Sequence, residues 1–381
     1  MSNYDVSAVP CHNYNKNEVK FALSVLLDSF GGLDFVTDGM CIAIKANLVT
    51  FAKPEEAVTT HPTLICALIE LLKERGAGRI IVGDSPGGLY NAVFLNKVYS
   101  VCGLNAVEEA GGELNRNFGQ TEARFEGAKV MHNFTYTSYL DEADAIINFC
   151  KLKTHGMMGM SAAAKNMFGV IPGTMKPEYH FRYPNAADFA RMIVDIDEYF
   201  KDKTKLCIAD AIVGMEGNGP TQGTPREIGA ILASKCPHKL DMVCAKIIGL
   251  DPETIPTLIA ARERGLIPDS INDLCICGDT DSLIIPDYNN VAVRHSLLFD
   301  NRSKLFGKVA RRVLEAKPTV RSHECKGCEK CKRICPAQAI TMKNGKPVID
   351  RKKCIKCFCC QEFCPFGAMK VHRSLLAKIL T

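Results

Sequence analysis

Residues 1–300 alternate between short runs of consecutive apolar residues and longer segments in which apolar residues recur every three or four positions. The short runs are typical of buried strands, and the longer segments are typical of helices that bury one face. Strands are predicted at residues 42–48, 79–82, 145–150, 206–209, 230–233 and 274–276. Strands that alternate with helices in this way predict an α/β body with a mainly parallel sheet.

The helix after the first of these strands has clear start and stop signals. Pro62 suits the first turn of a helix, because the backbone N–H that proline lacks has no partner there. Apolar side chains recur at helical spacing from Leu64 to Leu72, and Gly76 is well suited to end the helix. A second helix is predicted to follow residues 83–88 and to end near Gly103.

The segment GDSPGG, residues 83–88, lies directly after a predicted strand. Ligands of open α/β sheets bind at the carboxyl ends of strands, so Asp84 and Ser85 are candidate binding residues. The segment is not a P-loop, because the Gly-Lys-Ser/Thr ending is missing. The alternative is a plain turn in which Asp84 caps the following helix.

Residues 151–180 combine glycines with a dense group of reactive side chains, which are Lys151, Lys153, His155, Lys165, Asn166 and His180. Lys165 lies in a run of small and apolar residues, where exposure to solvent is not expected. Burial lowers the pKa of a lysine, which can then act as a base or as a covalent anchor. His155 and His180 are candidates for a base or a metal ligand, and the alternative for each is a core histidine with satisfied hydrogen bonds.

Seven of the sixteen residues at positions 214–229 are glycine or proline, which predicts that this segment has no regular structure. A long segment without periodicity is typically a binding loop or a lid. Its polar candidates for contact with a ligand are Glu216, Asn218 and Arg226.

The chain has 19 cysteines, and nine of them lie between Cys325 and Cys364. Two runs share the spacing C-x2-C-x2-C-x3-C-P and begin 29 residues apart; they are Cys325, Cys328, Cys331 and Cys335, and then Cys354, Cys357, Cys360 and Cys364. This repeat resembles the bacterial two-cluster ferredoxin, in which the fourth cysteine of each run ligates the other cluster. The resemblance implies two [4Fe–4S] clusters, one on Cys325, Cys328, Cys331 and Cys364, and one on Cys354, Cys357, Cys360 and Cys335.

Cys359 has no counterpart in the first run, so we expect that it is not a ligand. A pair of zinc sites is the alternative, because zinc also binds closely spaced cysteines. Between the runs, Asn344-Gly345 predicts a tight hairpin turn. We therefore expect a small α+β ferredoxin-like domain at residues 321–372, an α/β domain at residues 1–300, and a basic linker or helix at residues 301–320.

Charge separates the two ends of the chain. Residues 321–372 carry 12 Lys or Arg against 4 Asp or Glu, a net charge of +8, whereas residues 1–320 carry a net charge of −5. We interpret the basic end as a surface that docks on the acidic body or on an acidic redox partner. Nucleic acid is not an expected partner, because the chain has no recognition motif and no Trp.

The sequence predicts a cytoplasmic protein. No uncharged apolar run reaches the roughly 18–20 residues that cross a bilayer, so no membrane span is expected. The first twenty residues include Asp5 and Glu18 and lack the apolar segment of a secretory signal. In the cytoplasm we expect the cysteines to be thiols or metal ligands rather than disulfides.

The body resembles the family known as domain of unknown function 362, which is often fused to a ferredoxin module. The resemblance runs through most of residues 5–270, and the family name implies no established activity. The matching motifs are Lys45-x-Asn47-Leu48, Thr60-His61-Pro62, Gly83-Asp84-Ser85-Pro86-Gly87, Lys151-x-Lys153-x-His155, Lys165-Asn166-x-Phe168-Gly169 and Glu216-Gly217-x-Gly219-Pro220.

Residues 143–180 are more distantly similar to the second-half signature of nickel-pincer lactate racemases. In those enzymes a lysine anchors the cofactor, a later histidine ligates nickel and an earlier histidine does acid–base work; the resemblance implies these roles for Lys165, His180 and His155. Ala163-Ala164 replaces the racemase glycine pair, and no histidine lies near residues 83–88. These departures favour shared ancestry of the fold without a nickel-pincer cofactor.

We favour an iron–sulfur oxidoreductase in which two clusters relay electrons to a substrate in the body, a chemistry suited to anaerobic conditions. No G-x-G-x-x-G motif is present, so neither a nicotinamide nor a flavin is expected. Two alternatives are a dedicated electron carrier or docking subunit, and a racemase-like enzyme with a redox-sensing ferredoxin module. The candidate catalytic residues are Lys165, His155 and His180; the candidates for binding a small, anionic substrate are Lys45, Asn47, Asp84, Ser85, Lys153, Asn166 and Glu216.

Overall fold

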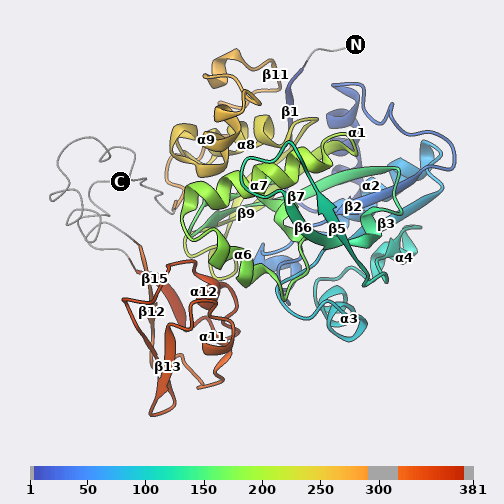
Figure 1. Cartoon of the computed structure of the whole chain (residues 1–381). Helices are drawn as coiled ribbons and strands as arrows, with labels where there is room; N and C mark the ends of the chain where they lie inside the picture. The colour runs from blue at the N-terminus through green and yellow to red at the C-terminus, as the bar shows by residue number, and fades with distance from the viewer. Residues whose placement is uncertain (1–3, 291–315, 373–381) are drawn as a thin grey trace.

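The computed structural model describes residues 4–290 and 316–372. The first range forms a body around a nine-stranded sheet, and the second forms a small module with two two-stranded sheets, which lies against one end of the body (Figure 1). Helices cover both faces of the large sheet. This architecture confirms the predicted fold class.

The large sheet is mixed and mostly parallel. Parallel pairing joins β9 to β7, β2, β3 and β4 in turn, and also joins β1 to β11, whereas β10 runs antiparallel between β1 and β9. The strands in order across the sheet are β11 (Ile276–Cys277), β1 (Val6–Pro10), β10 (Thr224–Ser234), β9 (Thr204–Glu216), β7 (Ala145–His155), β2 (Cys41–Lys45), β3 (Arg79–Gly83) and β4 (Glu113–Leu114), with β8 (Gly159–Ser161) antiparallel to β7.

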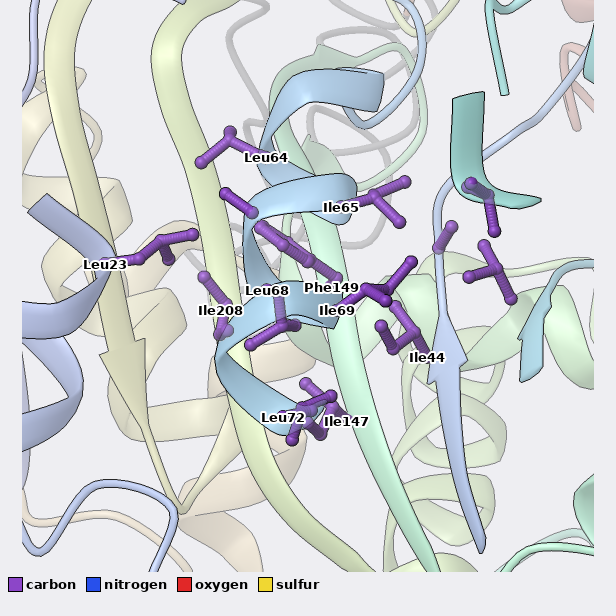
Figure 2. Close-up of a cluster of buried hydrophobic side chains, with 14 of the residues drawn as sticks. Leu23, Ile44, Leu64, Ile65, Leu68, Ile69, Leu72, Ile147, Phe149 and Ile208 are labelled. Carbon is purple, nitrogen blue, oxygen red and sulfur yellow. The ribbon is translucent and has the colours of Figure 1, made fainter. Parts of the chain in front are cut away.

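The alternation of side chains along β7 explains the two helical layers. Ile147 and Phe149 point to one face, where they pack with α1, α2 and α3, and Ile146 and Cys150 point to the other face (Figure 2). The first layer contains α1 (Lys16–Asp28), α2 (Pro62–Glu74) and α3 (Ala92–Val101); the second contains α5 (Ala163–Asn166), α7 (Ala186–Phe200), α8 (Pro237–Ile247) and α9 (Pro256–Glu263). The sheet is thus buried on both faces, which is why runs of consecutive apolar residues occur in its central strands.

The helix α2 begins and ends as its sequence predicts. His61 is the N-cap, and its Nδ1 accepts the backbone N–H of Thr63 at 3.3 Å. Leu64, Leu68 and Leu72 lie on the buried side of the helix, over the middle of the sheet (Figure 2). Burial of each such side chain stabilises the fold by about 1.5–3 kcal/mol, and truncation of Leu68 to alanine is expected to cost about 2–5 kcal/mol.

Several strands are longer than predicted, and one prediction about a loop is wrong. Residues 214–229 have regular structure, because β9 continues to Glu216 and β10 begins at Thr224, so that only residues 217–223 form the turn. The backbone N–H and C=O groups of the two strands form hydrogen bonds with each other in an antiparallel ladder. The register shift between Glu227 and Ala230 accommodates Gly229. The ladder outweighs the weak strand preference of glycine and proline. The last strand comprises residues 276–277 rather than 274–276.

The C-terminal module contains two short hairpin-like pairs and two single-turn helices. Asn344 and Gly345 have positive φ values of 47° and 70°, which confirms the predicted hairpin turn. The elements are β12 (Lys317–Val320), which pairs with β15 (Met369–His372), β13 (Ile340–Lys343), which pairs with β14 (Lys346–Ile349), α11 (Lys330–Arg333) and α12 (Cys359–Glu362). The pairing of β12 puts residues 317–320 in the module, whereas residues 301–315 of the predicted linker lie outside the described residues.

Candidate functional site

A cavity lies where the carboxyl ends of β2 and β3 face the C-terminal module. Its wall contains residues of the body and, from α12 and the residue after it, Glu362 and Phe363 of the module. Seven candidates from the sequence line it, namely Asn47, Asp84, Ser85, Lys153, Lys165, Asn166 and His180. The principle that ligand sites form at strand carboxyl ends therefore located the cavity correctly.

The loops after β2 and β3 are joined by a buried ion pair. Lys45 Nζ lies 2.7 Å from Asp84 Oδ1, and Asp84 also accepts the backbone N–H groups of Leu48 and Ser85 at 2.7 and 2.8 Å. Asp84 is therefore not a helix cap, because α3 begins only at Ala92 and has Asn91 as its N-cap. Asp84 instead fixes the shape of the cavity floor.

Gly169 is required beside this ion pair. A Cβ atom at residue 169 would collide with Asp84 Oδ1 and with Lys45 Nζ. The Lys165-Asn166-x-Phe168-Gly169 segment thus approaches the floor closely only because residue 169 has no side chain.

A chain of amide hydrogen bonds connects three elements at the cavity. Asn166 donates to Asn148 Oδ1 at 2.7 Å and to the Lys45 carbonyl at 3.1 Å, and it accepts from Asn47 at 2.9 Å. Asn47 Oδ1 in turn accepts a hydrogen bond of 2.6 Å from Lys153 Nζ. The network holds Lys153 in a fixed position, and burial together with the nearby cations Lys165 and Lys151 lowers its pKa to about 7.

Lys165 and Lys176 present two more ammonium groups to the cavity. Protein surrounds the Lys165 side chain, yet part of its surface stays accessible because it faces the cavity. Lys176 donates to the carbonyl groups of Ser85 and Ile171 at 2.6 and 2.5 Å. Burial lowers the pKa of Lys165 and lowers the pKa of Lys176 to about 7.

His180 lies on α6 (Lys176–Arg182) and stacks on Phe189, with ring centroids 4.3 Å apart. Burial lowers the pKa of His180 to about 3, so its ring is neutral at physiological pH. Its Nδ1 is buried and has no hydrogen-bond partner among the described residues. His180 is thus not the satisfied core histidine of the alternative interpretation.

His155 does not line the cavity but contacts a residue that does. Its Nδ1 accepts the backbone N–H groups of Met157 and Met158, both at 3.2 Å, so the proton of the neutral ring is at Nε2. Nε2 lies 3.0 Å from Glu362 Oε1, although the alignment is too poor for a regular hydrogen bond. Burial lowers the pKa of His155 to about 4; burial acts to raise the pKa of Glu362, but contact with His155 and the cation Lys165 lower it to about 2.

Besides His155, other candidates from the sequence also lie outside the cavity wall. Lys45 is occupied by Asp84 beneath the floor, and Lys151 pairs with Asp210 at 2.9 Å. Glu216 accepts the backbone N–H of Asn289 at 3.0 Å. The structure therefore divides the lysines that were expected to share one cleft into two structural ion pairs and the cavity residues Lys153 and Lys165.

Lys176, Glu362 and Phe363 line the cavity but were not predicted from the sequence. Nothing distinguishes Lys176 from a surface lysine, because its burial depends on loops distant in the sequence. A signal for the other two exists in the cysteine repeat. Alignment of the two runs puts Gln361, Glu362 and Phe363 opposite the residues Lys332, Arg333 and Ile334. The second run has lost its positive charges at the positions that face the body.

The turn between β9 and β10 receives the module. Thr221 and Gln222 donate to the carbonyl groups of Glu362 and Gln361 at 3.2 and 2.5 Å. Gln361 Nε2 donates back to the Asn218 carbonyl at 3.1 Å, and Asn218 Oδ1 accepts the N–H of Val371 at 3.3 Å. Residues 217–222 are thus a binding segment whose partner, among the described residues, is the module.

Two smaller cavities lie inside the module. The first is lined by Cys325, Cys328, Cys331 and Cys364, and the second by Cys335, Cys354, Cys357 and Cys360. Each set combines three cysteines of one run with the last cysteine of the other, and Cys359 lines neither cavity.

The donor set suits iron–sulfur clusters. Thiolates are the ligands of such clusters, and four of them surround each cavity rather than meeting at one point. Across residues 4–290 and 316–372, no group of three or more His, Cys, Asp or Glu side chains is arranged to hold a single metal ion.

Comparison with known proteins identifies both parts of the chain. Residues 42–246 match the family described as domain of unknown function (DUF362), and residues 317–365 match the 4Fe-4S dicluster domain. A relative, the thylakoid-associated protein sll1697 of Synechocystis sp., is 33% identical over 270 residues, which cover 69% of this chain and 80% of that protein. In the part of the chain that the structure describes, no helix is long and apolar enough to cross a membrane.

Two solved structures share similarity with the chain. The lactate racemase apoprotein from Thermoanaerobacterium thermosaccharolyticum has a TM-score of 0.40 and 12% identity, over 65% of this chain and 57% of that chain. A Thermotoga maritima protein has a TM-score of 0.34 and 14% identity, over 56% of this chain and 53% of that chain. The chain thus spans little more than half the length of each.

The family match covers more than half of the chain, and its motifs form the floor and wall of the central cavity. The ferredoxin-like resemblance of the cysteine repeat is confirmed by the second match. The chain therefore belongs to the DUF362 family and carries a 4Fe-4S dicluster domain at its C-terminal end.

Proposed function

We propose that the chain is a cytoplasmic iron–sulfur oxidoreductase that reduces or oxidises a small molecule bound in the central cavity. One observation carries this proposal. On the single turn of α12, Cys360 lines a cysteine cavity and Glu362 lines the central cavity. Because these residues are two positions apart on one helical turn, α12 forms part of the wall of both cavities.

The two sets of four cysteines are the proposed ligands of two [4Fe–4S] clusters. When bound, such clusters supply or accept single electrons at low potential. Cys328 is exposed, whereas Cys357 and Cys360 are buried beside the body. The first set therefore faces the surroundings of the protein, and the second set faces the central cavity.

The residues of the body would bind the substrate and exclude water. Lys165 and His180 are the proposed catalytic residues, because both face the cavity and neither ammonium nor Nδ1 has a hydrogen-bond partner among the described residues. His155 is proposed as a positioning residue that acts through Glu362. Asn47, Ser85, Lys153 and Asn166 complete the proposed substrate site.

A dedicated electron carrier would not require the cavity or its unpaired polar groups. A racemase-like enzyme would use the cavity but would have no need for a cysteine cavity that shares α12 with it. The position of α12 therefore favours an oxidoreductase over both alternatives.

Two experiments test the proposal. The first measures the metal content of anaerobically purified full-length protein, and the second uses a variant in which a large side chain fills the central cavity. The chain should contain about eight iron and eight sulfide ions, and its visible absorbance should bleach with dithionite. Stoichiometric zinc without such absorbance would contradict the cluster assignment. Thr50 lines the cavity, and Thr50→Trp should fill it.

The reduced wild type and the reduced Thr50→Trp variant, with equal iron content, are each mixed with a panel of small-molecule oxidants. For at least one oxidant, the reoxidation rate of the wild type should be at least ten times that of the variant. Lys73→Trp, a surface substitution on α2, is the control. Equal rates for every oxidant would mean that electrons leave without using the cavity, and the carrier function would then be favoured.

A further inference from the structure

The central cavity contains more hydrogen-bond donors with positive charge than the protein itself satisfies. An ammonium group has three N–H donors. Lys153 and Lys176 each use two, on Asn47 Oδ1 and the Val58 carbonyl and on the Ser85 and Ile171 carbonyls, respectively. Lys165 uses none on any described residue, and its Nζ lies over the Phe168 ring, 5.9 Å from the centroid.

The carboxylates of the cavity do not neutralise these lysines. Asp84 is occupied by Lys45 and by two backbone N–H groups. The low pKa of Glu362 keeps this carboxylate ionised, and its charge acts on Lys165, but it forms no ion pair with any of the three lysines and is one charge against three. A buried charge without a partner is costly, so the arrangement indicates a site built for an anion that arrives from outside the chain.

The apolar part of the cavity wall limits the form of that anion. Lys165 and Lys176 both lie over the Phe168 ring, at 5.9 and 5.8 Å from its centroid, so the two cations belong to one end of the site. Phe168, Phe363 and Val49 offer apolar surface in the same cavity. A ligand that satisfies both parts has a carboxylate at one end and an apolar body.

We propose that Lys165 and Lys176 bind the carboxylate of a small organic acid whose apolar body packs between Phe168 and Phe363. This inference rests on the proposed function for its biological meaning, since the acid would be the redox substrate. The binding site itself does not depend on electron transfer, because it can be measured on the oxidised protein.

The test is calorimetric titration of the oxidised full-length protein with two matched pairs of probes, benzoate and benzamide, and hexanoate and hexanamide. At least one acid should bind tenfold or more tightly than its uncharged amide. Lys165→Met and Lys176→Met should each weaken that binding at least tenfold. Lys246→Met is the matched control, because Lys246 pairs with Asp281 far from the cavity wall, and it should leave the affinity unchanged.

Three results would overturn the proposal: equal affinity for acid and amide in both pairs, unchanged binding in the folded Lys165→Met variant, or tighter binding of inorganic phosphate than of either acid. Folding is checked by iron content. Binding of an acid without any cavity-dependent reoxidation would retain this site and reject the oxidoreductase, so the two proposals fail separately.

A second inference comes from the internal repeat of the module. The helices α11 and α12 occupy equivalent places within their cysteine runs, and both begin after a residue with left-handed backbone, Glu329 with φ 59° and Phe358 with φ 61°. The α12 face is covered by the body, with Phe358 and Gln361 buried. In Figure 1, α12 lies next to the body and α11 lies farther from it.

The α11 face is exposed and strongly basic. Lys326, Lys332 and Arg333 are exposed around Cys328, which is itself an exposed member of the first cysteine set. Phe366, 47% exposed, also lines the first cysteine cavity. Glu329 on the same face pairs with Lys332 at 3.2 Å, and Lys326 and Arg333 are cations without a carboxylate partner among the described residues. A face with this excess of positive charge around an apolar contact is suited to brief, electrostatically steered association with a protein of opposite charge.

We infer that the α11 face docks an acidic one-electron carrier protein, which exchanges electrons with the module at the first cysteine set. The charge of the face excludes basic partners, and the body already covers the equivalent α12 face. The carrier is the reductant or oxidant that the proposed chemistry requires: each transfer moves one electron and no group.

The probe is an acidic bacterial flavodoxin, with association to the full-length protein measured at several salt concentrations. The combined substitution of Lys326, Lys332 and Arg333 by Glu should reduce the association rate constant at low salt at least tenfold and abolish its salt dependence. The control is the substitution of Lys352 and Lys353, two exposed lysines elsewhere on the module, by Glu. It should reduce the association rate constant less. Equal loss in both variants, or no loss in the first, would overturn the inference.

Discussion

Single residues at the cavity show how strongly the surroundings change the chemistry of a side chain. Lys45 and Lys151 are buried but paired with Asp84 and Asp210, and they serve the fold. Lys153 is buried and Lys165 and Lys176 are half-buried; none of the three has a carboxylate partner among the described residues, and they keep donors for a ligand. The difference lies in the partner and not in the residue type, so a lysine's role here is decided by what its loop meets.

The unpaired lysines predict an unusual pH dependence of stability. The pKa of Lys176 falls to about 7 from its ordinary value of 10.5, so between these values the unfolded chain binds more protons than the folded one. Stability supplied through this residue should therefore rise with pH from about 7 to about 10.5, by up to about 1.4 kcal/mol per pH unit. Below pH 7 Lys176 is protonated in both states, so its destabilising contribution to the free energy of unfolding no longer changes with pH.

Anaerobic melting of the wild type and Lys176→Met between pH 6 and 10 isolates this contribution. The apparent Tm of the variant should be higher than that of the wild type. The difference between the two Tm values should be largest at low pH and should decrease as the pH rises. Lys246→Met, which removes an outlying lysine, should melt in parallel with the wild type. A gap that stays constant above pH 7 would show that Lys176 keeps an ordinary pKa.

The cysteines allow a second prediction at this scale. Cys335→Ala should remove a wall of the cavity formed with Cys354, Cys357 and Cys360, and iron should fall from about eight to about four per chain. Cys359→Ala should retain about eight, because Cys359 lines neither cysteine cavity. Iron analysis and low-temperature EPR of the reduced variants provide the measurement. Loss of iron in Cys359→Ala would reverse the assignment of the ligands.

Among the elements, α12 and the turn at residues 217–222 determine how the module meets the body. The turn joins β9 and β10, whose facing ends were predicted as part of one irregular segment, and it forms hydrogen bonds with α12 at both Gln361 and Glu362. Gly87 lets the loop after β3 approach Phe363, because a Cβ atom at residue 87 would collide with that ring. The contact thus combines backbone hydrogen bonds with a close fit.

Gln361→Met should loosen this contact without loss of iron. The substitution removes the donor to the Asn218 and Gly219 carbonyls and leaves them unsatisfied, at a cost of about 1–3 kcal/mol. Hydrogen exchange of residues 217–222 should therefore accelerate. Lys332→Met, at the equivalent position of the first run, is the matched control and should leave exchange in this segment unchanged. Equal exchange in both variants would show that the module docks by other contacts.

On the scale of the whole molecule, the body has its own large core on both faces of the sheet. A chain that ends at residue 290 should therefore fold alone, with a cooperative melt and α/β circular dichroism. It should bind benzoate more weakly than the full chain, because the cavity loses Glu362 and Phe363. An insoluble or molten body would show that the module is part of the core.

Much of the fold and part of the site were predictable from local pattern. Strand–helix alternation is a property of short segments, since each buries its apolar residues against the same sheet. Candidate binding residues were predicted after β2, after β3 and within residues 151–180, and they lie near one another because the carboxyl ends of parallel strands share one edge. Residues 214–229 were mispredicted because ladder formation between β9 and β10 is a long-range interaction that composition does not report.

The sequence alone determined the α/β class, the cysteine repeat with its two sets of four, and the separation of a basic module from an acidic body, because each depends on spacing or charge along the chain. Only the tertiary structure decided which lysines are paired and which face the cavity, because each partner comes from a distant loop. It also decided that Glu362 and Phe363 of the module close a site in the body. The physical reason is that burial and pairing depend on three-dimensional proximity, which the local pattern of a sequence does not encode.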